Sequence, residues 1–394
     1  MTMEVVLCHA IRTPVGRFGG SLKELPAPEL GATVVRDLLR RSDLSGDLID
    51  GAFFGQVIQA GAGMNPARQA ALHGGVPESV PAATVNRVCG SGAEAIVMAA
   101  RQVRLGEADC VIAGGMENMD QGPYLLESGR WGYRMGPGEI LDATLRDGLN
   151  DAFSGKHSGW HTEDLVEQRD ISRKAQDKWA ARSQQRFSKA QSDGRFVDEI
   201  VPVMLKEKSG DRAFDADESN RPDATADSLA KLKPAFRKDG TITAGNAPGL
   251  NSAAAAMIVT TRDFADKHDL DVFARLVSTG VGAVEPGMFG LGPVPAVHQA
   301  LNRADWSVSD IERAEINEAF AAIAIALTQE LGLSEDIVNV EGGAIAHGHP
   351  IGATGAVLAT RLLHSMKRDS LRRGLVTLCI GGGQGIALLV ERDD

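Results

Sequence analysis

Cysteine is scarce in this chain of 394 residues, and its few cysteines cannot build a disulfide scaffold. Cys8, Cys89, Cys110 and Cys379 are too widely spaced for that role, and none belongs to the C-x-x-C pair of a typical metal site. We therefore expect reduced thiols and no bound metal.

Long hydrophobic runs are also missing. No uninterrupted apolar stretch is long enough to span a bilayer, and residues 1–6 lack the basic segment and apolar segment of a secretion signal. These features argue against a membrane protein. We expect no membrane partner and a cytoplasmic location.

The chain has no excess of basic residues. Lysine and arginine number 41 against 52 aspartates and glutamates, so the formal net charge is −11 at pH 7. We therefore expect no nucleic-acid partner, and an anionic ligand would need a local basic patch. One cluster contains Arg221, Lys231, Lys233, Arg237 and Lys238. By itself, this cluster is better explained as a solvated helix face.

The length and composition predict a globular protein of two or more domains. Hydrophobic residues make up 43% of the chain and charged residues 24%, and 394 residues exceed the usual size of one hydrophobic core. Residues 4–10, 51–58 and 108–115 are expected to be buried strands, and residues 29–40 a helix. This alternation predicts an α/β fold with parallel strands joined by crossover helices.

Residues 116–240 have a different character. They are polar and rich in glycine and proline, with short helical segments such as residues 173–190. A loop-rich insertion of this length usually carries a binding function. Regular structure is expected to resume with an apolar strand over residues 253–260.

The last third of the chain repeats features of the first third at a nearly constant spacing. The matches are Ile-Asp-Gly-Ala at 49–52 with Ile-Glu-Arg-Ala at 311–314, Ser-Gly-Ala at 91–93 with Thr-Gly-Ala at 354–356, and Gly-Gly at 114–115 with Gly-Gly at 381–382. Together they predict a duplicated α/β unit. The interface between two such halves is a common location for an active site.

Residues 86–93, Asn-Arg-Val-Cys-Gly-Ser-Gly-Ala, place Cys89 between an apolar strand-like run and a helix-like run. The positive end of that helix would favour a thiolate, and Gly90 and Gly92 would allow close approach of a substrate. A lone cysteine is nevertheless more often a small core residue. The motif alone therefore does not identify a nucleophile.

The second half supplies three groups that could complete a site around Cys89. His349 stands between Gly348 and Pro350 in a glycine-rich segment, which suits a base whose ring must be oriented. Cys379 ends an apolar strand beside several glycines, and Asn317 begins an Asn-Glu-Ala-Phe sequence. Singly, these groups could be a loop histidine, a hairpin and a helix cap. Together they indicate a reaction centre.

Four short blocks resemble the signature sequences of the thiolase family, in the order and spacing of that family. They are Cys-Gly-Ser-Gly at 89–92, Asn-Glu-Ala-Phe at 317–320, Gly-His-Pro at 348–350 and Cys-Ile-Gly-Gly-Gly at 379–383. The likeness runs from Arg-Thr-Pro at 12–14 to Val-Glu-Arg at 390–392. Residues 130–149 look most like the short-chain, tetramer-forming acetyl-CoA acetyltransferases of the family.

The resemblance implies duplicated βαβαβαββ halves that form a layered α-β-α-β-α core. It assigns residues 1–117 with 245–270 to the first half and residues 271–394 to the second. Residues 118–244 would then form a loop domain for coenzyme A binding and tetramerisation. The implied assembly is a homotetramer, formed as a dimer of dimers.

The implied reaction is a reversible Claisen condensation of acyl-CoA with acetyl-CoA, or thiolysis of a 3-ketoacyl-CoA in reverse. Cys89 would carry the acyl group, His349 would take the proton of the Cys89 thiol, and Cys379 would move the α-proton. The His349 ring and a water held by Asn317 would stabilise the enolate oxygen, and the N–H groups of Cys89 and Gly381 would stabilise the acyl-enzyme oxygen. No permanent cofactor is implied, because coenzyme A and acetyl-CoA are substrates.

The resemblance also implies residues that contact coenzyme A or the acyl chain. These are Leu149, His157, Arg221, Ser228, Phe236, Ala244, Leu250, Phe289 and Phe320. Coenzyme A is polyanionic, so the basic cluster within residues 221–238 acquires a plausible ligand.

Three positions depart from the pattern of short-chain members: Ser158 replaces a methionine, Pro248 replaces a serine, and Phe289 stands where methionine is common. All three fall around the substrate, so we expect altered acyl-CoA affinity or chain preference. Two alternatives to an acetyl-CoA acetyltransferase stay open. One is a degradative 3-ketoacyl-CoA thiolase of broader chain length, and the other is a catalytically idle acyl-CoA-binding homologue.

Overall fold

The computed structural model of the chain describes residues 3–208 and 210–393. The strands of the main sheet are β1 (Val5–Arg12), β2 (Gly16–Arg17), β3 (Gly51–Gly55), β4 (Ala82–Val85), β5 (Cys110–Asn118), β10 (Asn251–Thr261), β11 (Val272–Ala283), β12 (Arg313–Ile316), β13 (Arg373–Ile380) and β14 (Gln384–Glu391). The strand order is β12-β13-β14-β11-β1-β10-β5-β3-β4, with β2 paired to β10.

Helices cover both faces of these strands and also occur in the segment between β5 and β10. They are α1 (Ala27–Ser42), α2 (Pro66–His73), α3 (Ser91–Leu105), α4 (Ser158–Gln168), α5 (Arg173–Ser192), α6 (Ala226–Leu229), α7 (Arg262–Lys267), α8 (Pro293–Ala304), α9 (Ala321–Glu330), α10 (Ala344–His347) and α11 (Thr354–Arg368). None of the helices within the described ranges is long and apolar enough to cross a membrane.

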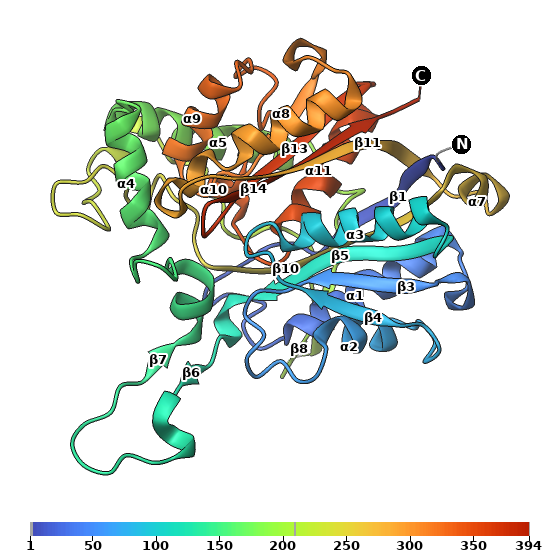
Figure 1. Ribbon diagram of the computed structural model, residues 1–394, viewed down its shortest axis with the longest axis horizontal. Coiled ribbons are helices and arrows are strands. Elements are labelled where there is room, and N and C mark those ends of the chain that lie inside the picture. Colours follow the sequence, from blue (N-terminus) through green and yellow to red (C-terminus); the bar gives the residue numbers. More distant parts are fainter. Residues whose placement is uncertain (1–2, 209, 394) are drawn as a thin grey trace.

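The elements stack in five layers, as predicted (Figure 1). Helices α1 and α2 cover the outer face of the first-half strands, and α8 and α9 cover the outer face of the second-half strands. Helices α3 and α11 lie between the two sets of strands and form one hydrophobic core with both. Because the sheet is covered on both faces, strands such as β10 are apolar along nearly their whole length.

Strand directions follow from the connections. Strand β3 pairs in parallel with β4 and β5, and β12 pairs in parallel with β13, as the alternation of strands and helices predicted. Strands β13 and β14 are antiparallel because only a short glycine turn joins them. Strands β1 and β11 also pair antiparallel and join the two halves.

Two of the three sequence matches mark equivalent positions of the duplicated unit. The first match leads into β3 and β12, and the second begins α3 and α11. The third match was wrong, because Gly114 and Gly115 lie within β5 whereas Gly381 and Gly382 follow the end of β13. The glycines of β5 accommodate the neighbouring strand and loop, whereas those after β13 form a turn.

The two central helices, α3 and α11, touch at their first residues, which are the matching sequences 91–93 and 354–356. A β-carbon on Gly92 would lie 2.8 Å from the backbone nitrogen of Ala356, and one on Gly355 would overlap the backbone nitrogen of Ala93. The contact is reciprocal, so each helix start needs a glycine to admit the other. This contact brings together the loops that precede α3 and α11.

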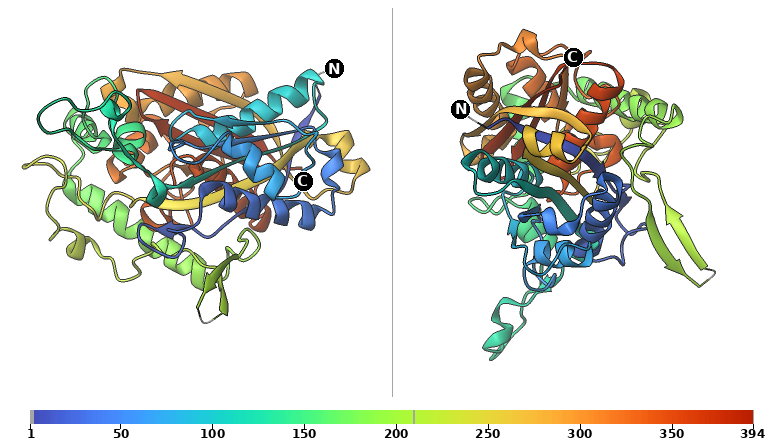
Figure 2. Two further views of the ribbon diagram at one scale, coloured as in Figure 1. Left: turned by 90° about the horizontal axis from the view of Figure 1, so that it is seen from below. Right: turned by 90° about the vertical axis from the view of Figure 1, so that its right-hand side faces the viewer.

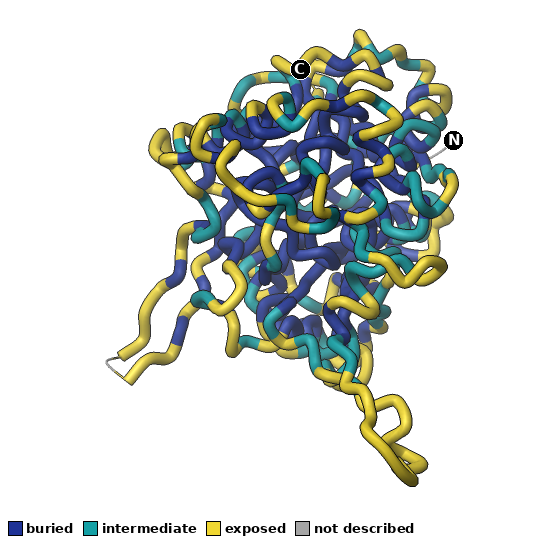
Figure 3. Tube along the Cα trace, turned by 90° about the vertical axis from the view of Figure 1, so that its left-hand side faces the viewer, coloured by how far each residue is buried: buried dark blue, intermediate teal, exposed yellow. Residues whose placement is uncertain are grey.

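The segment between β5 and β10 lies mainly outside the layers. It carries α4, α5 and α6 with the strand pairs β6 (Tyr124–Leu125) and β7 (Leu141–Asp142), and β8 (Val203–Glu207) and β9 (Gly210–Phe214). Figure 2 shows both strand pairs projecting from the body, and Figure 3 shows that their outer parts are exposed while the layers are buried. Helix α5 contacts α6, α9 and α10, so this segment packs against the second half.

We predict that Gly355→Ala destabilises the protein by about 1–3 kcal/mol, because the added methyl group meets backbone that cannot move independently. Gly51→Ala is the matched control, since the nearest heavy atoms to its β-carbon lie at 3.9 Å. Urea unfolding measures both variants. Equal free energies of unfolding for Gly355→Ala and Gly51→Ala would contradict the steric account.

Candidate active site

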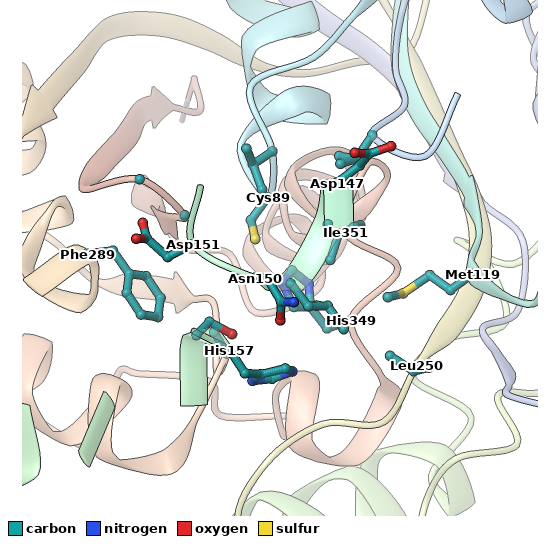
Figure 4. A pocket seen from close by; sticks show the side chains of 18 of the residues that line it. Cys89, Met119, Asp147, Asn150, Asp151, His157, Leu250, Phe289, His349 and Ile351 are labelled. Atoms are coloured by element: carbon teal, nitrogen blue, oxygen red, sulfur yellow. The ribbon is translucent and has the colours of Figure 1, made fainter. Parts of the chain in front are cut away.

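A cavity of about 790 Å³ opens beside the starts of α3 and α11. Its walls include residues of the loop before α3, the segment 146–161, the loop before β10 and the turn after β13. Figure 4 shows the Cys89 sulfur and the His349 ring directed into the same space, with Phe289 and His157 along one side and Leu250 on the other. Residues from both halves therefore meet at one cavity.

Cys89 sits on a turn between β4 and α3 that is held by polar side chains. The amide of Val88 donates to Asn86 Oδ1 at 2.9 Å, and the Ser91 hydroxyl donates to the Val88 carbonyl at 2.6 Å while accepting from the Arg87 amide at 2.9 Å. Val88 has a φ of 44°, a left-handed conformation that a β-branched residue rarely adopts. The turn is strained and presents the next residue, Cys89, to the cavity.

The Cys89 thiol is protonated in the resting site, contrary to the expectation that the helix start would favour a thiolate. Burial raises the pKa of this thiol to about 11, although the backbone N–H groups of Gly381 and Cys89 act in the opposite direction. Desolvation therefore outweighs these two backbone hydrogen bonds. The nucleophile needs a base, and the two N–H groups are placed beside its sulfur.

His349 is uncharged at neutral pH, because burial lowers its pKa to about 4. Its Nδ1 lies 2.7 Å from the Thr354 hydroxyl oxygen, and that hydroxyl donates to the Pro350 carbonyl at 2.8 Å. Since the Thr354 hydroxyl already uses its proton, it accepts from Nδ1–H. The proton therefore sits on Nδ1, and Nε2 is free to act as a base.

Asn317 and Cys379 are fully buried and do not belong to the lining of the cavity, but Asn317 neighbours His349 and Cys379 is coupled to Cys89. Asn317 Nδ2 is 3.3 Å from His349 Nε2, and Asn317 Oδ1 is buried without a hydrogen-bond partner in the described structure. Cys379 is fully buried at the end of β13. Burial, and then the nearby Cys89 charge, raise the pKa of Cys379 well above that of an ordinary thiol.

Glu318 anchors the loop that carries Asn317. Its two carboxylate oxygens accept from Trp179 Nε1 at 2.9 Å and from the Ser183 hydroxyl at 2.7 Å, both on α5. Further donors are Asn339 Nδ2 at 3.1 Å and the amide of Ile345 at 3.1 Å. The inserted segment thereby fixes the loops on either side of the reaction centre.

Six of the nine residues predicted to contact coenzyme A or the acyl chain line the cavity. They are Leu149, His157, Phe236, Leu250, Phe289 and Phe320. The rings of His157 and Phe236 stack with centroids 4.6 Å apart, and Phe236 meets Phe320 edge to face at 6.0 Å. Ser158 and Pro248, two of the departures from the family pattern, also belong to the lining.

The other three predicted residues, Arg221, Ser228 and Ala244, lie outside this lining. Arg221 Nη1 donates to the Ala244 carbonyl at 3.2 Å, so these two residues are neighbours. Ser228 is exposed at the start of α6, where its hydroxyl and that of Thr225 form a capping box. All three residues are exposed and do not line the apolar cavity.

Thr354 and Glu117 were not identified from the sequence. Thr354 occupies the same place in the second half as Ser91 in the first, and both hydroxyls hold the loop in front of their helix. The duplication was a signal that could have drawn attention to Thr354. Glu117 has no such local signal, because its partners lie in distant segments.

All four cysteines are free thiols, and within the described parts of the chain no group of three histidines, cysteines or acidic residues is arranged to hold a metal ion.

Comparisons with known proteins agree with this arrangement. The thiolase N-terminal domain family matches residues 5–263, and the thiolase C-terminal domain family matches residues 270–392. A probable acetyl-CoA acyltransferase of Staphylococcus epidermidis is 51% identical over 389 residues, with 98% of each chain covered. An acetyl-CoA acetyltransferase of Pseudomonas aeruginosa is 48% identical over 391 residues, covering 99% of this chain and all of the relative.

The crystal structure of the acetyl-CoA acetyltransferase of Bacillus anthracis has the same fold. It superposes with a TM-score of 0.97 at 43% sequence identity, and 99% of each chain is covered. Both family domains and these full-length relatives lead to one conclusion: the chain belongs to the thiolase family.

Proposed function

We propose that this protein is an acetyl-CoA C-acyltransferase that condenses an acyl-CoA with acetyl-CoA and catalyses the reverse thiolysis. The observation that carries the proposal is the meeting of Cys89, an uncharged His349 and the Gly381 amide at one cavity. Names of relatives that act on acetyl-CoA support the same assignment.

The first half-reaction transfers the acyl group to Cys89. His349 Nε2 takes the thiol proton as the sulfur attacks the thioester carbonyl of the acyl-CoA. The N–H groups of Cys89 and Gly381, which already face the sulfur, then receive the negative carbonyl oxygen. The bond to the coenzyme A sulfur breaks, and the acyl group remains on Cys89.

The second half-reaction needs a stronger base than an ordinary thiolate in water. When Cys379 gives its proton to the departing coenzyme A sulfur, burial leaves it as a strongly basic thiolate. That thiolate takes the α-proton of acetyl-CoA. A water on the unpartnered Oδ1 of Asn317, together with the His349 ring, would stabilise the enolate oxygen. The α-carbon attacks the acyl carbonyl and expels Cys89 as a thiolate, which takes back the proton that His349 Nε2 received in the first half-reaction.

The polar neighbours of the cavity would hold the rest of coenzyme A. Leu149, His157, Phe236, Leu250 and Phe320 provide an apolar channel for pantetheine. Arg221, Ser228 and Ala244 would then contact the nucleotide at its outer end. Most of these contacts come from the proposed loop domain, residues 118–244. Leu250 belongs to the first half (residues 1–117 with 245–270) and Phe320 to the second half (residues 271–394).

We further propose a cytoplasmic homotetramer assembled through the loop that carries β6 and β7. This loop exposes large apolar side chains, which is unusual for a surface without a partner. They are Tyr124, Leu126, Trp131, Tyr133, Met135 and Ile140. Light scattering of the full chain tests the assembly, and a monomeric mass would contradict it.

Cys89→Ala should reduce turnover by at least about 1,000-fold, because Cys89 is the thiol that lines the cavity and the variant has no sulfur there to carry the acyl group. Loss of the Mg²⁺-enolate absorbance of acetoacetyl-CoA in the presence of free coenzyme A measures thiolysis. Cys110→Ala, in a buried strand, is the matched control and should remain active. Full activity in Cys89→Ala would eliminate the proposed mechanism.

Thr354→Val should lower kcat about 10- to 100-fold with a smaller change in KM, because Nδ1–H of His349 loses its acceptor and the ring its orientation. Thr354→Ser keeps the hydroxyl and should retain most of the activity. Steady-state thiolysis of acetoacetyl-CoA measures both variants. If Thr354→Val and Thr354→Ser have the same kcat, the Thr354 hydroxyl does not orient the His349 ring.

Pro248→Ser should lower the KM for acetoacetyl-CoA several-fold at nearly unchanged kcat. A hydroxyl facing pantetheine restores one hydrogen bond, which contributes about 0.5–1.5 kcal/mol. Pro202→Ser, outside the cavity, is the control. Thiolysis over a series of acyl chain lengths, in the natural protein and both variants, measures affinity and chain preference. If the natural protein has the chain-length profile and the KM of ordinary short-chain enzymes, the effect predicted for Ser158, Pro248 and Phe289 is refuted.

A further inference from the structure

Glu117 is a buried carboxylate at the reaction centre that the proposed mechanism does not use. It lies at the end of β5 with no exposed surface, close to both the turn after β3 and the loop that carries His349. A carboxylate in such a position costs free energy unless hydrogen bonds compensate for its lost hydration. Its presence therefore calls for a physical explanation.

The carboxylate joins backbone from the two halves of the fold. One oxygen accepts from the amides of Val57 and Gly352, both at 2.9 Å, and the other accepts from the amide of Ile58 at 3.3 Å. Val57 and Ile58 follow β3 in the first half, whereas Gly352 precedes α11 in the second. Three backbone N–H groups thus converge on one side chain.

The Gly352 peptide packs tightly between this carboxylate and the end of β3. A β-carbon at Gly352 would lie 2.6 Å from the Glu117 oxygen, and one at Gly55 would lie 2.6 Å from the Gly352 carbonyl. Gly352 stands between His349 and Thr354, the residue that holds the His349 ring. Glu117 therefore holds the segment that carries both His349 and Thr354, in addition to the bond from the His349 amide to Asn251 Oδ1 at 2.9 Å.

Glu117 also acts on the nucleophile electrostatically. Burial is the main cause of the raised Cys89 pKa, and the Glu117 charge raises it further. Burial also raises the pKa of Glu117 itself to about 7, against the three backbone hydrogen bonds that lower it. Above that pH the carboxylate is ionised, and Val57, whose amide it binds, lines the same cavity as Cys89.

We propose that Glu117 is a positioning residue whose carboxylate ties the His349 loop to the Cys89 half of the fold and places a negative charge against Val57, which lines the same cavity as Cys89. This role rests on the proposed function, in which Cys89 attacks the thioester. It explains why a carboxylate is retained where a neutral side chain would be cheaper to bury. A thiol kept protonated until substrate arrives also reacts slowly with unrelated electrophiles.

The test compares Glu117→Gln with Glu315→Gln. Glutamine preserves the shape and one acceptor oxygen but removes the charge. Glu315 is the matched control because it is also a buried carboxylate, on β12, and does not contribute to the raised pKa of Cys89. The rate of alkylation of Cys89 by iodoacetamide is measured against pH, with Cys89→Ala as background.

In Glu117→Gln we expect the alkylation profile to move to lower pH, so that the reaction at pH 8 is about 3- to 10-fold faster. The Glu315→Gln profile should coincide with that of the unaltered protein. If the pH profile of alkylation in Glu117→Gln coincides with that of the unaltered protein, the electrostatic role is overturned. A carboxylate with only a structural role would not shift this profile.

Glu117→Asp tests the hydrogen bonds to the Val57, Ile58 and Gly352 amides separately. This variant keeps the charge but draws the carboxylate back by one methylene group. We expect the alkylation midpoint to stay in place while kcat for acetoacetyl-CoA thiolysis falls about 10-fold or more with little change in KM. An unchanged kcat in the folded variant, checked by circular dichroism, would overturn the positioning role. If Cys89→Ala were still active, the proposed function would fail instead, so the two failures are distinguishable.

Discussion

The close contact between the starts of α3 and α11 is the constraint on which the reaction centre depends. Both helices are buried between the two sets of strands, and Gly92 and Gly355 let their backbones touch. Neither helix can move without displacing a layer, because protein interiors are close-packed. The loops in front of them, which carry Cys89 and His349, therefore face each other across one cavity.

The same packing decides the charge state of the site. Burial raises the pKa of Cys89 to about 11 and lowers that of His349 to about 4, so the resting pair is a neutral thiol and a neutral imidazole. Charge develops only when the thiol attacks, next to N–H groups that are already oriented. Burial of Cys379 has the complementary effect, since its thiolate becomes a stronger base.

Much of the fold was predictable because its signals are local. Apolar runs and helical periodicity identified β1, β5, β10, α1 and α3 to within a few residues, and the duplication identified the paired helix starts. The thiolate expected for Cys89 was wrong, because a helix start can be recognised in a sequence but the desolvation of a side chain cannot. The third repeat match was wrong because paired glycines serve both strand contacts and turns.

By itself, the sequence determined the identity of the chemical groups and an α/β fold, since motifs and periodicity reside in neighbouring residues, and the resemblance of its signature blocks added the family and the layered core. The tertiary structure decided which distant groups touch and how readily each takes a proton. Thr354 selects the tautomer of His349, and Glu117 binds an amide 235 positions away. Such pairings, and the desolvation that shifts each pKa, depend on how whole layers pack, so no local pattern contains them.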